Sequence, residues 1–116
     1  MTDKTQIGRK GENLAAEFLV KQGFEIAARN YRFGRGEIDL IVKRDDWLLF
    51  IEVKTRSSYD YGHPEDFLEE FQANRIFNAA ENYIFDIDWQ GNVRFDVVSI
   101  LLGKEVVIEH FEDAIN

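Results

Sequence analysis

The sequence predicts an α/β fold in which a mixed sheet of four to five strands carries a helix on each face. Three observations predict it: two helical repeats of apolar residues, several strand-length apolar runs, and one long helical connection between the third and fourth runs. Short connections join the first three runs as an antiparallel meander, whereas the long one favours a parallel crossover. With 116 residues, no internal repeat and no linker-like stretch, we expect one domain over residues 1–116.

The two helices are expected from apolar residues that recur three and four positions apart. In residues 5–22 this stripe comprises Ile7, Gly11, Leu14, Ala15, Phe18 and Leu19. Gly23 follows, at a position where a glycine with positive φ commonly ends a helix. In residues 72–85 the stripe comprises Ile76, Ala79, Ala80, Tyr83 and Ile84.

Five runs of strand length complete the pattern. They span residues 24–31, 37–43, 47–55, 93–102 and 106–111. Gly34 and Gly36 lie between the first two runs, and Asp45 and Asp46 lie between the next two, as is typical of tight turns. The predicted order is therefore helix, three strands, helix, two strands, a restriction endonuclease-like order.

Composition narrows the class of protein. Hydrophobic residues make up 45% of the chain and charged residues 31%, which is typical of a globular domain. Because there is no cysteine, a disulfide scaffold, a zinc ribbon and an iron–sulfur cluster are excluded. No apolar run approaches the roughly 18 residues of a membrane helix. The first residues also lack the apolar core of a signal peptide, so a cytoplasmic protein with no membrane partner is expected.

Charge is distributed unevenly along the chain. The net charge is −8, a sign that opposes binding of nucleic acid through overall electrostatic attraction. Residues 1–58, however, carry eleven Lys and Arg against nine Asp and Glu, whereas residues 59–116 carry three against thirteen. A site that binds an anion is therefore expected in the first half.

Two neighbouring strands carry charged residues where a core would be apolar. Side chains alternate between the faces of a sheet, so Ile38, Leu40 and Val42 are expected on one face and Asp39 on the other. In the next strand Glu52 and Lys54 share a face by the same alternation. If these strands pair as a hairpin, Asp39, Glu52 and Lys54 converge near one end of the sheet.

Two carboxylates and a lysine at one place suggest a metal-dependent phosphodiesterase. Mg²⁺ or Mn²⁺ needs only one or two carboxylates, here Asp39 and Glu52, and the Val53 carbonyl is a further candidate ligand. Such an ion acidifies a water and neutralises charge on the phosphoryl oxygens. Lys54 would orient the water or stabilise the transition state. The plainer interpretation is an exposed sheet face with a weak Glu–Lys pair.

Further candidates lie on the first helix and around the first turn. Glu12 borders the apolar stripe of its helix, where a carboxylate can lean over the sheet edge as an accessory catalytic group. Taken alone, Glu12 is better explained as a surface charge near a helix N-terminus. Arg9, Arg29, Arg32 and Arg56 are candidate nucleic-acid contacts, since basic and aromatic residues interleave there as in a phosphate-tracking groove.

Several motifs in order resemble the YraN-like family of small bacterial proteins. They are Gly8-Arg9-Lys10-Gly11-Glu12, Gly23-Phe24-Glu25-Ile26, Arg29-Asn30-Tyr31-Arg32, Gly36-Glu37-Ile38-Asp39-Leu40-Ile41, Ile51-Glu52-Val53-Lys54-Thr55-Arg56 and Arg94-Phe95-Asp96-Val97-Val98. That family is similar to the PD-(D/E)XK nuclease superfamily, which includes Holliday-junction resolvases. The resemblance implies that Asp39, Glu52 and Lys54 match the catalytic triplet and Glu12 the helix carboxylate. Gln72 loosely matches a partner residue on the second helix.

Three functions follow as hypotheses. The leading one is a Mg²⁺- or Mn²⁺-dependent endonuclease that hydrolyses DNA, branched or single-stranded DNA included. The alternative is a catalytically inactive module that binds nucleic acid or a protein on a nuclease scaffold. A third is a protein whose acidic segment, with Glu65, Glu69 and Glu70, docks a basic partner. The sequence leaves the oligomeric state open, a homodimer included.

Overall fold

The computed structural model describes residues 4–57 and 70–115, and in them it confirms the predicted fold class. The elements are α1 (Lys4–Lys21), β1 (Glu25–Phe33), β2 (Gly36–Arg44), β3 (Trp47–Arg56), α2 (Glu70–Ile87), β4 (Asn92–Leu102) and β5 (Val106–Phe111). They form a five-stranded sheet in the order β1-β2-β3-β4-β5. The β3–β4 pair is parallel and the other pairs are antiparallel, as the long helical crossover predicted.

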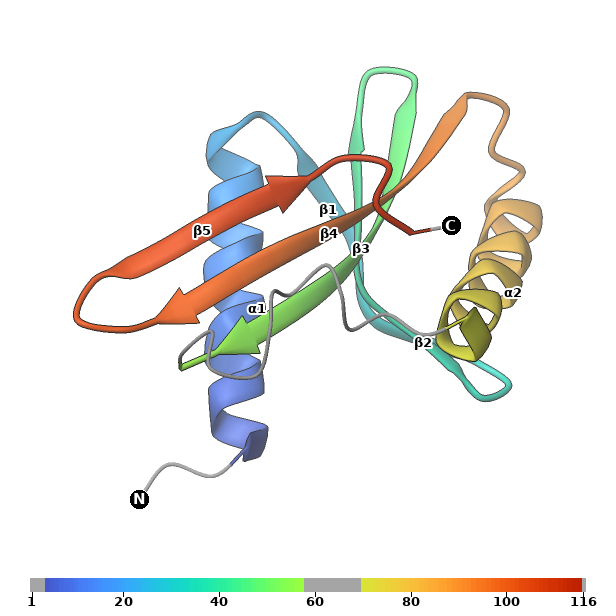
Figure 1. Cartoon of the computed structure of the whole chain (residues 1–116). Helices are drawn as coiled ribbons and strands as arrows, with labels where there is room; N and C mark the ends of the chain where they lie inside the picture. The colour runs from blue at the N-terminus through green and yellow to red at the C-terminus, as the bar shows by residue number, and fades with distance from the viewer. Residues whose placement is uncertain (1–3, 58–69, 116) are drawn as a thin grey trace.

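The two helices cover opposite faces of the sheet and create two apolar layers (Figure 1). On the α1 side, Leu19 packs with residues such as Leu49 and Val98. On the α2 side, Phe50 packs with residues such as Ile76. The first helix contacts mainly β3 and the second mainly β2. None of the helices in the described residues is long and apolar enough to cross a membrane.

The alternation of side chains along β2 breaks at Asp39, and the prediction for Ile38 is wrong. Leu40 and Val42 lie in the α1-side layer as predicted, but Ile38 lies in the α2-side layer with Ile41. Asn30, on the adjacent strand, falls between the same rungs as Asp39 and has a φ of 52°. A left-handed residue interrupts the pleat. Side chains before and after this position therefore lie on different faces from those that strict alternation predicts.

A buried carboxylate ties the C-terminal residues to the sheet. Asp96 on β4 is fully buried and accepts hydrogen bonds from Arg94 at 2.9 Å and from the Asp113 N–H at 2.9 Å. His110 Nε2 lies 2.7 Å from the same carboxylate. Burial alone raises the pKa of Asp96, but these hydrogen bonds outweigh it and hold the pKa below its ordinary value. His110, for which the sequence favours a surface or packing role over metal ligation, thus has a structural role.

We expect Asp96→Asn to lower the free energy of unfolding by about 2–3 kcal/mol at neutral pH, because it leaves a guanidinium without its buried partner. A depressed carboxyl pKa stabilises the fold above the unfolded pKa and ceases to do so as pH falls through the folded pKa. The deficit should therefore shrink in acid. Urea unfolding of both proteins at neutral and acidic pH measures this, with exposed Glu105→Gln as control. A deficit that is constant with pH contradicts the assignment.

Candidate active site

Asp39 and Glu52 lie where β2 and β3 diverge. The β2–β3 pairing ends at the Leu40–Ile51 rung. Beyond that rung the Asp39 carboxylate replaces the missing backbone partner, and its Oδ2 accepts a hydrogen bond of 2.8 Å from the Val53 N–H. We call the space between the diverging strands the β2–β3 fork. Because the N–H and C=O of one strand residue point to the same side, the Val53 carbonyl also faces this fork. The sequence had no signal for the fork itself.

Lys54 and Gln72 both approach the Glu52 carboxylate. Lys54 Nζ lies 3.7 Å from Glu52 Oε1, and the two side chains are only 14% and 12% exposed. From α2, Gln72 Nε2 lies 3.5 Å from the same oxygen. The structure therefore places Asp39, Glu52 and Lys54 near one another at one end of the sheet, as predicted, although the alternation along β2 breaks at Asp39. It adds Gln72, the helix residue that the family resemblance matched only loosely.

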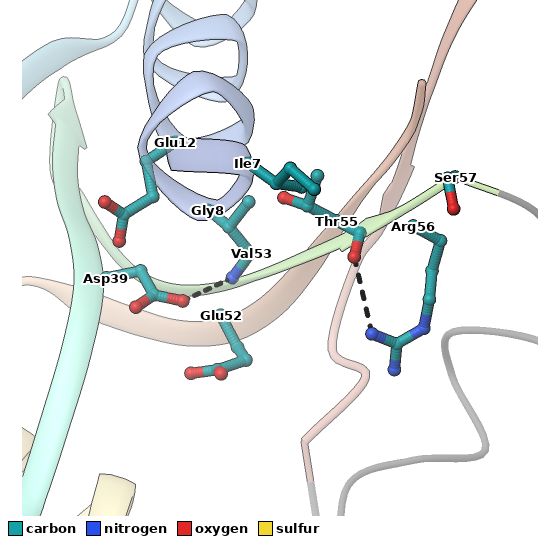
Figure 2. A pocket seen from close by; sticks show the side chains of 9 residues that line it. All are labelled: Ile7, Gly8, Glu12, Asp39, Glu52, Val53, Thr55, Arg56 and Ser57. Carbon is teal, nitrogen blue, oxygen red and sulfur yellow. Dashed lines mark hydrogen bonds between the residues drawn. The ribbon is translucent and has the colours of Figure 1, made fainter. Parts of the chain in front are cut away.

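Glu12 reaches the fork from α1. A Cβ at Gly11 would overlap the Thr55 side chain, so the absence of one lets the helix lie directly on β3. Figure 2 shows Glu12 extending from α1 toward Asp39, while Glu52 points to the other side of β3.

Asn30 links Glu12 to another carboxylate. Oriented as its neighbours require, the Asn30 amide nitrogen donates to Glu12 Oε1 at 2.9 Å and to Glu37 Oε1 at 3.1 Å. Sequence reasoning assigned no role to Asn30 or Glu37 at this site. The only signal was their position within motifs shared with the YraN-like family.

Two cavities open on either side of the carboxylate pair. The larger, of about 540 Å³, is lined by Glu12, Asp39, Glu52, Val53 and Arg56, among others (Figure 2). A second, of about 280 Å³, lies toward α2 and is also lined by Asp39 and Glu52. The pair is therefore largely buried, yet it lines a cavity on each side.

The electrostatics of the pair are unbalanced. Burial raises the pKa of Asp39 to about 8, with further contributions from the charges of Glu52, Glu12 and Glu37, against the opposing Val53 hydrogen bond. Burial likewise raises the pKa of Glu52 to about 7, opposed chiefly by Lys54. Within the described part of the chain, Lys54 opposes the shift at Glu52, whereas only the Val53 hydrogen bond opposes it at Asp39. Among the described residues, no three His, Cys, Asp or Glu side chains form a metal-ligand group.

The predicted arginine contacts divide into two groups. Arg56 lines the larger cavity, and its Nη1 donates to the Thr55 carbonyl at 3.4 Å. Arg9 and Arg32 line a third cavity, of about 400 Å³, which also includes Glu12. Arg29 lines none of the three cavities around the carboxylates. Its Nη2 instead donates to Asn13 Oδ1 at 2.6 Å.

The acidic segment of the third hypothesis falls largely outside the described residues. Glu65 and Glu69 are not described, nor is His63. Glu70 begins α2, but its side chain is not described either. A docking role for these residues stays a prediction.

Fold and site together define a class of protein: a small α/β protein whose α-β-β-β-α-β-β order is consistent with a restriction endonuclease-like core. The chain belongs to the uncharacterised protein family UPF0102, whose sequence model matches residues 11–100. This confirms the YraN-like resemblance inferred from the motifs. The matched range contains Glu12, Asp39, Glu52 and Lys54.

Relatives in this family align over most of their length. A UPF0102 protein of Flavobacterium psychrophilum is 39% identical over 115 residues, which cover 98% of this chain and 97% of that protein. One from Chloroherpeton thalassium is 46% identical over 105 residues, covering 90% and 81% respectively. Another, from Solibacter usitatus, is 46% identical over 111 residues, covering 92% and 83%.

The raised carboxyl pKa values predict that the free energy of unfolding, measured in a chelator that removes divalent cations, depends on pH. The pKa of Asp39 rises from 3.8 to about 8 on folding, so the folded protein keeps a proton that the unfolded chain has lost. This stabilisation is complete below the unfolded pKa and is lost as pH rises toward 8. Asp39→Asn should therefore flatten the decline in unfolding free energy, leaving the part due to Glu52.

Urea unfolding at several pH values between 4 and 8 measures both slopes. Asp45→Asn is the matched control, because it removes a carboxylate from the exposed β2–β3 turn. A slope in Asp39→Asn equal to that of the unmodified protein would be incompatible with a buried, protonated Asp39.

Proposed function

We propose that this protein is a divalent-cation-dependent endonuclease that hydrolyses phosphodiester bonds in DNA. The observation that carries the proposal is the Asp39–Glu52 carboxylate pair at the β2–β3 fork, with Lys54 Nζ 3.7 Å from Glu52 and an open cavity on either side. Carboxylates and an amine on rigid strands at an accessible cleft are the groups that metal-assisted phosphodiester hydrolysis requires.

The residues present fit a divalent cation. Asp39 and Glu52 supply two oxygen-bearing side chains, which suffices for Mg²⁺ or Mn²⁺, since these ions keep several waters. The Val53 carbonyl, which faces the same fork, is a third candidate ligand. The raised pKa values support this fit, because a buried pair of carboxylates that lacks positive charge gains most from a bound cation.

Each residue has a distinct part in the proposed reaction. A bound cation supplies positive charge at the phosphate and acidifies the attacking water. The Lys54 ammonium, held on β3 beside Glu52, orients that water or stabilises charge that develops on the phosphoryl oxygens. Glu12 is an accessory carboxylate, and the Asn30 amide fixes its direction. Gln72 limits the movement of Glu52.

DNA is the proposed substrate because arginines surround an otherwise acidic centre. Arg56 lines the cavity on one side, and Arg9 and Arg32 line the adjoining one. Guanidinium groups pair well with phosphates and set the position of a backbone without reading its sequence. Local positive charge of this kind allows binding despite a net charge of −8.

Cleavage assays with Mn²⁺ on flap, junction, single-stranded and duplex DNA test the proposal. We expect cleavage of at least one substrate, abolished by EDTA. Glu52→Gln and Lys54→Ala should each lower the rate by about 100-fold or more, since each removes charge that acts on the transition state. Glu25→Gln and Lys104→Ala, both on exposed residues, are the matched controls. DNA binding without cleavage of any substrate would instead favour the inactive-module alternative.

Cation binding can be measured without turnover. Water-proton relaxation with Mn²⁺ should detect a site that Asp39→Asn and Glu52→Gln each weaken by about 10-fold or more, as loss of one hard oxygen ligand predicts. Asp45→Asn should leave the affinity unchanged. Equal Mn²⁺ affinity in all four proteins would refute the assignment of the ligands, whatever the cleavage assay shows.

A further inference from the structure

The cavity on the α2 side brings together two arginines that are distant in the sequence. Arg35 comes from the β1–β2 turn and Arg75 from α2, and both side chains are exposed. They line the cavity of about 280 Å³ that also contains Asp39 and Glu52. The first half of the chain was expected to hold the anion-binding residues, but Arg75 lies in the acidic second half.

A close backbone contact brings together the two segments that carry these arginines. Gly36, directly after Arg35, is buried, and a Cβ built on it would collide with the Arg75 carbonyl oxygen and lie 3.0 Å from its carbon. The same Cβ would lie 3.3 Å from the Ala79 Cβ. The turn therefore rests directly on α2, which fixes Arg35 next to Arg75.

The same helix also faces the carboxylates. Gln72 Nε2 lies 3.5 Å from Glu52 Oε1, and Arg75 is three residues further along α2, so the two side chains neighbour each other on one helix surface. The lining of this cavity therefore combines the two carboxylate residues of the proposed reaction centre with Arg35 and Arg75. Guanidinium groups recognise phosphate oxygens with paired hydrogen bonds.

The cavities around the fork adjoin one another. Asp39 and Glu52 line both the 540 Å³ and the 280 Å³ cavities, and Glu37 lines both the 280 Å³ and the 400 Å³ cavities. Arginines thus lie on either side of the carboxylates, Arg56 on one and Arg35 with Arg75 on the other. A single free anion needs one such position, whereas a strand with repeated phosphates uses both.

We propose that Arg35 and Arg75 form a phosphate subsite, which holds a phosphodiester of a nucleic-acid strand next to the one at Asp39 and Glu52. This inference rests on the proposed function, because it assigns the path of a strand across that centre. The subsite binds charge and backbone and requires no base-specific contact.

Binding of a labelled single-stranded DNA, followed by fluorescence anisotropy in EDTA over a range of KCl concentrations, tests the subsite. We expect Arg35→Gln and Arg75→Gln each to weaken binding about 3-fold and the double variant about 10-fold. The slope of log affinity against log salt should fall by about 0.7 for each phosphate that no longer pairs with a guanidinium. Arg35→Lys and Arg75→Lys should restore most of the slope but less of the affinity, because an ammonium keeps the charge without the paired hydrogen bonds.

Lys104→Gln, in the exposed β4–β5 turn, is the matched control for removal of one positive charge. A double variant that binds as tightly as the unmodified protein, or weakens only as much as Lys104→Gln, overturns the subsite. So does inorganic phosphate that competes as well as an equal concentration of DNA phosphate, because the site would then serve a free anion. Thermal melting of each variant confirms that it is folded.

The cleavage assay separates this inference from the proposed function. If the unmodified protein cleaves DNA in a Glu52-dependent manner and the arginine variants bind and cleave normally, the subsite is wrong and the function stands. If binding depends on Arg35 and Arg75 but no substrate is cleaved, the subsite stands and the nuclease proposal falls. If the unmodified protein neither binds DNA in EDTA nor cleaves it with Mn²⁺, both are overturned.

Discussion

One hydrogen bond organises the site: the Asp39 carboxylate accepts the Val53 N–H at the point where β2 and β3 part. An unpaired backbone N–H in a half-buried position is costly, so a side-chain acceptor is required once the ladder has ended. The carboxylate meets that requirement and is thereby drawn out of solvent. Its position beside Glu52 follows from this local need of the backbone, and the cavities exist because the strands separate there.

As a result, acidic groups are concentrated at the fork with little positive charge from the described residues to balance them. Burial and the charges of neighbouring carboxylates raise the pKa values of Asp39 and Glu52, and Lys54 is the main opposing charge at Glu52. The structural carboxylate of Asp96 has the opposite pKa shift, because hydrogen-bond donors surround it and lower its pKa. Raised carboxyl pKa values at an open cleft favour the proposed cation site.

Close packing of the two helices against the sheet encloses the fork, so that cavities form there. Gly11 lets α1 lie against Thr55, which brings Glu12 over the fork, and Gly36 lets the β1–β2 turn lie against α2. Each glycine removes a Cβ at a helix–sheet contact, so the two helices approach from opposite faces. The cavities are bounded by elements whose separation these contacts fix, so the side chains that line them are held on rigid supports.

The order of elements, the parallel crossover and the shared location of Asp39, Glu52 and Lys54 were predictable from the sequence, because apolar periodicity and strand alternation are local properties. The reversed face of Ile38, the bridging amide of Asn30 and the shared cavity of Arg35 and Arg75 were not. They depend on a left-handed residue between two rungs and on backbone contacts between distant segments. Residue spacing determined which groups this protein places on each strand; only the tertiary structure decided where the strands part, because that depends on which backbone groups find partners.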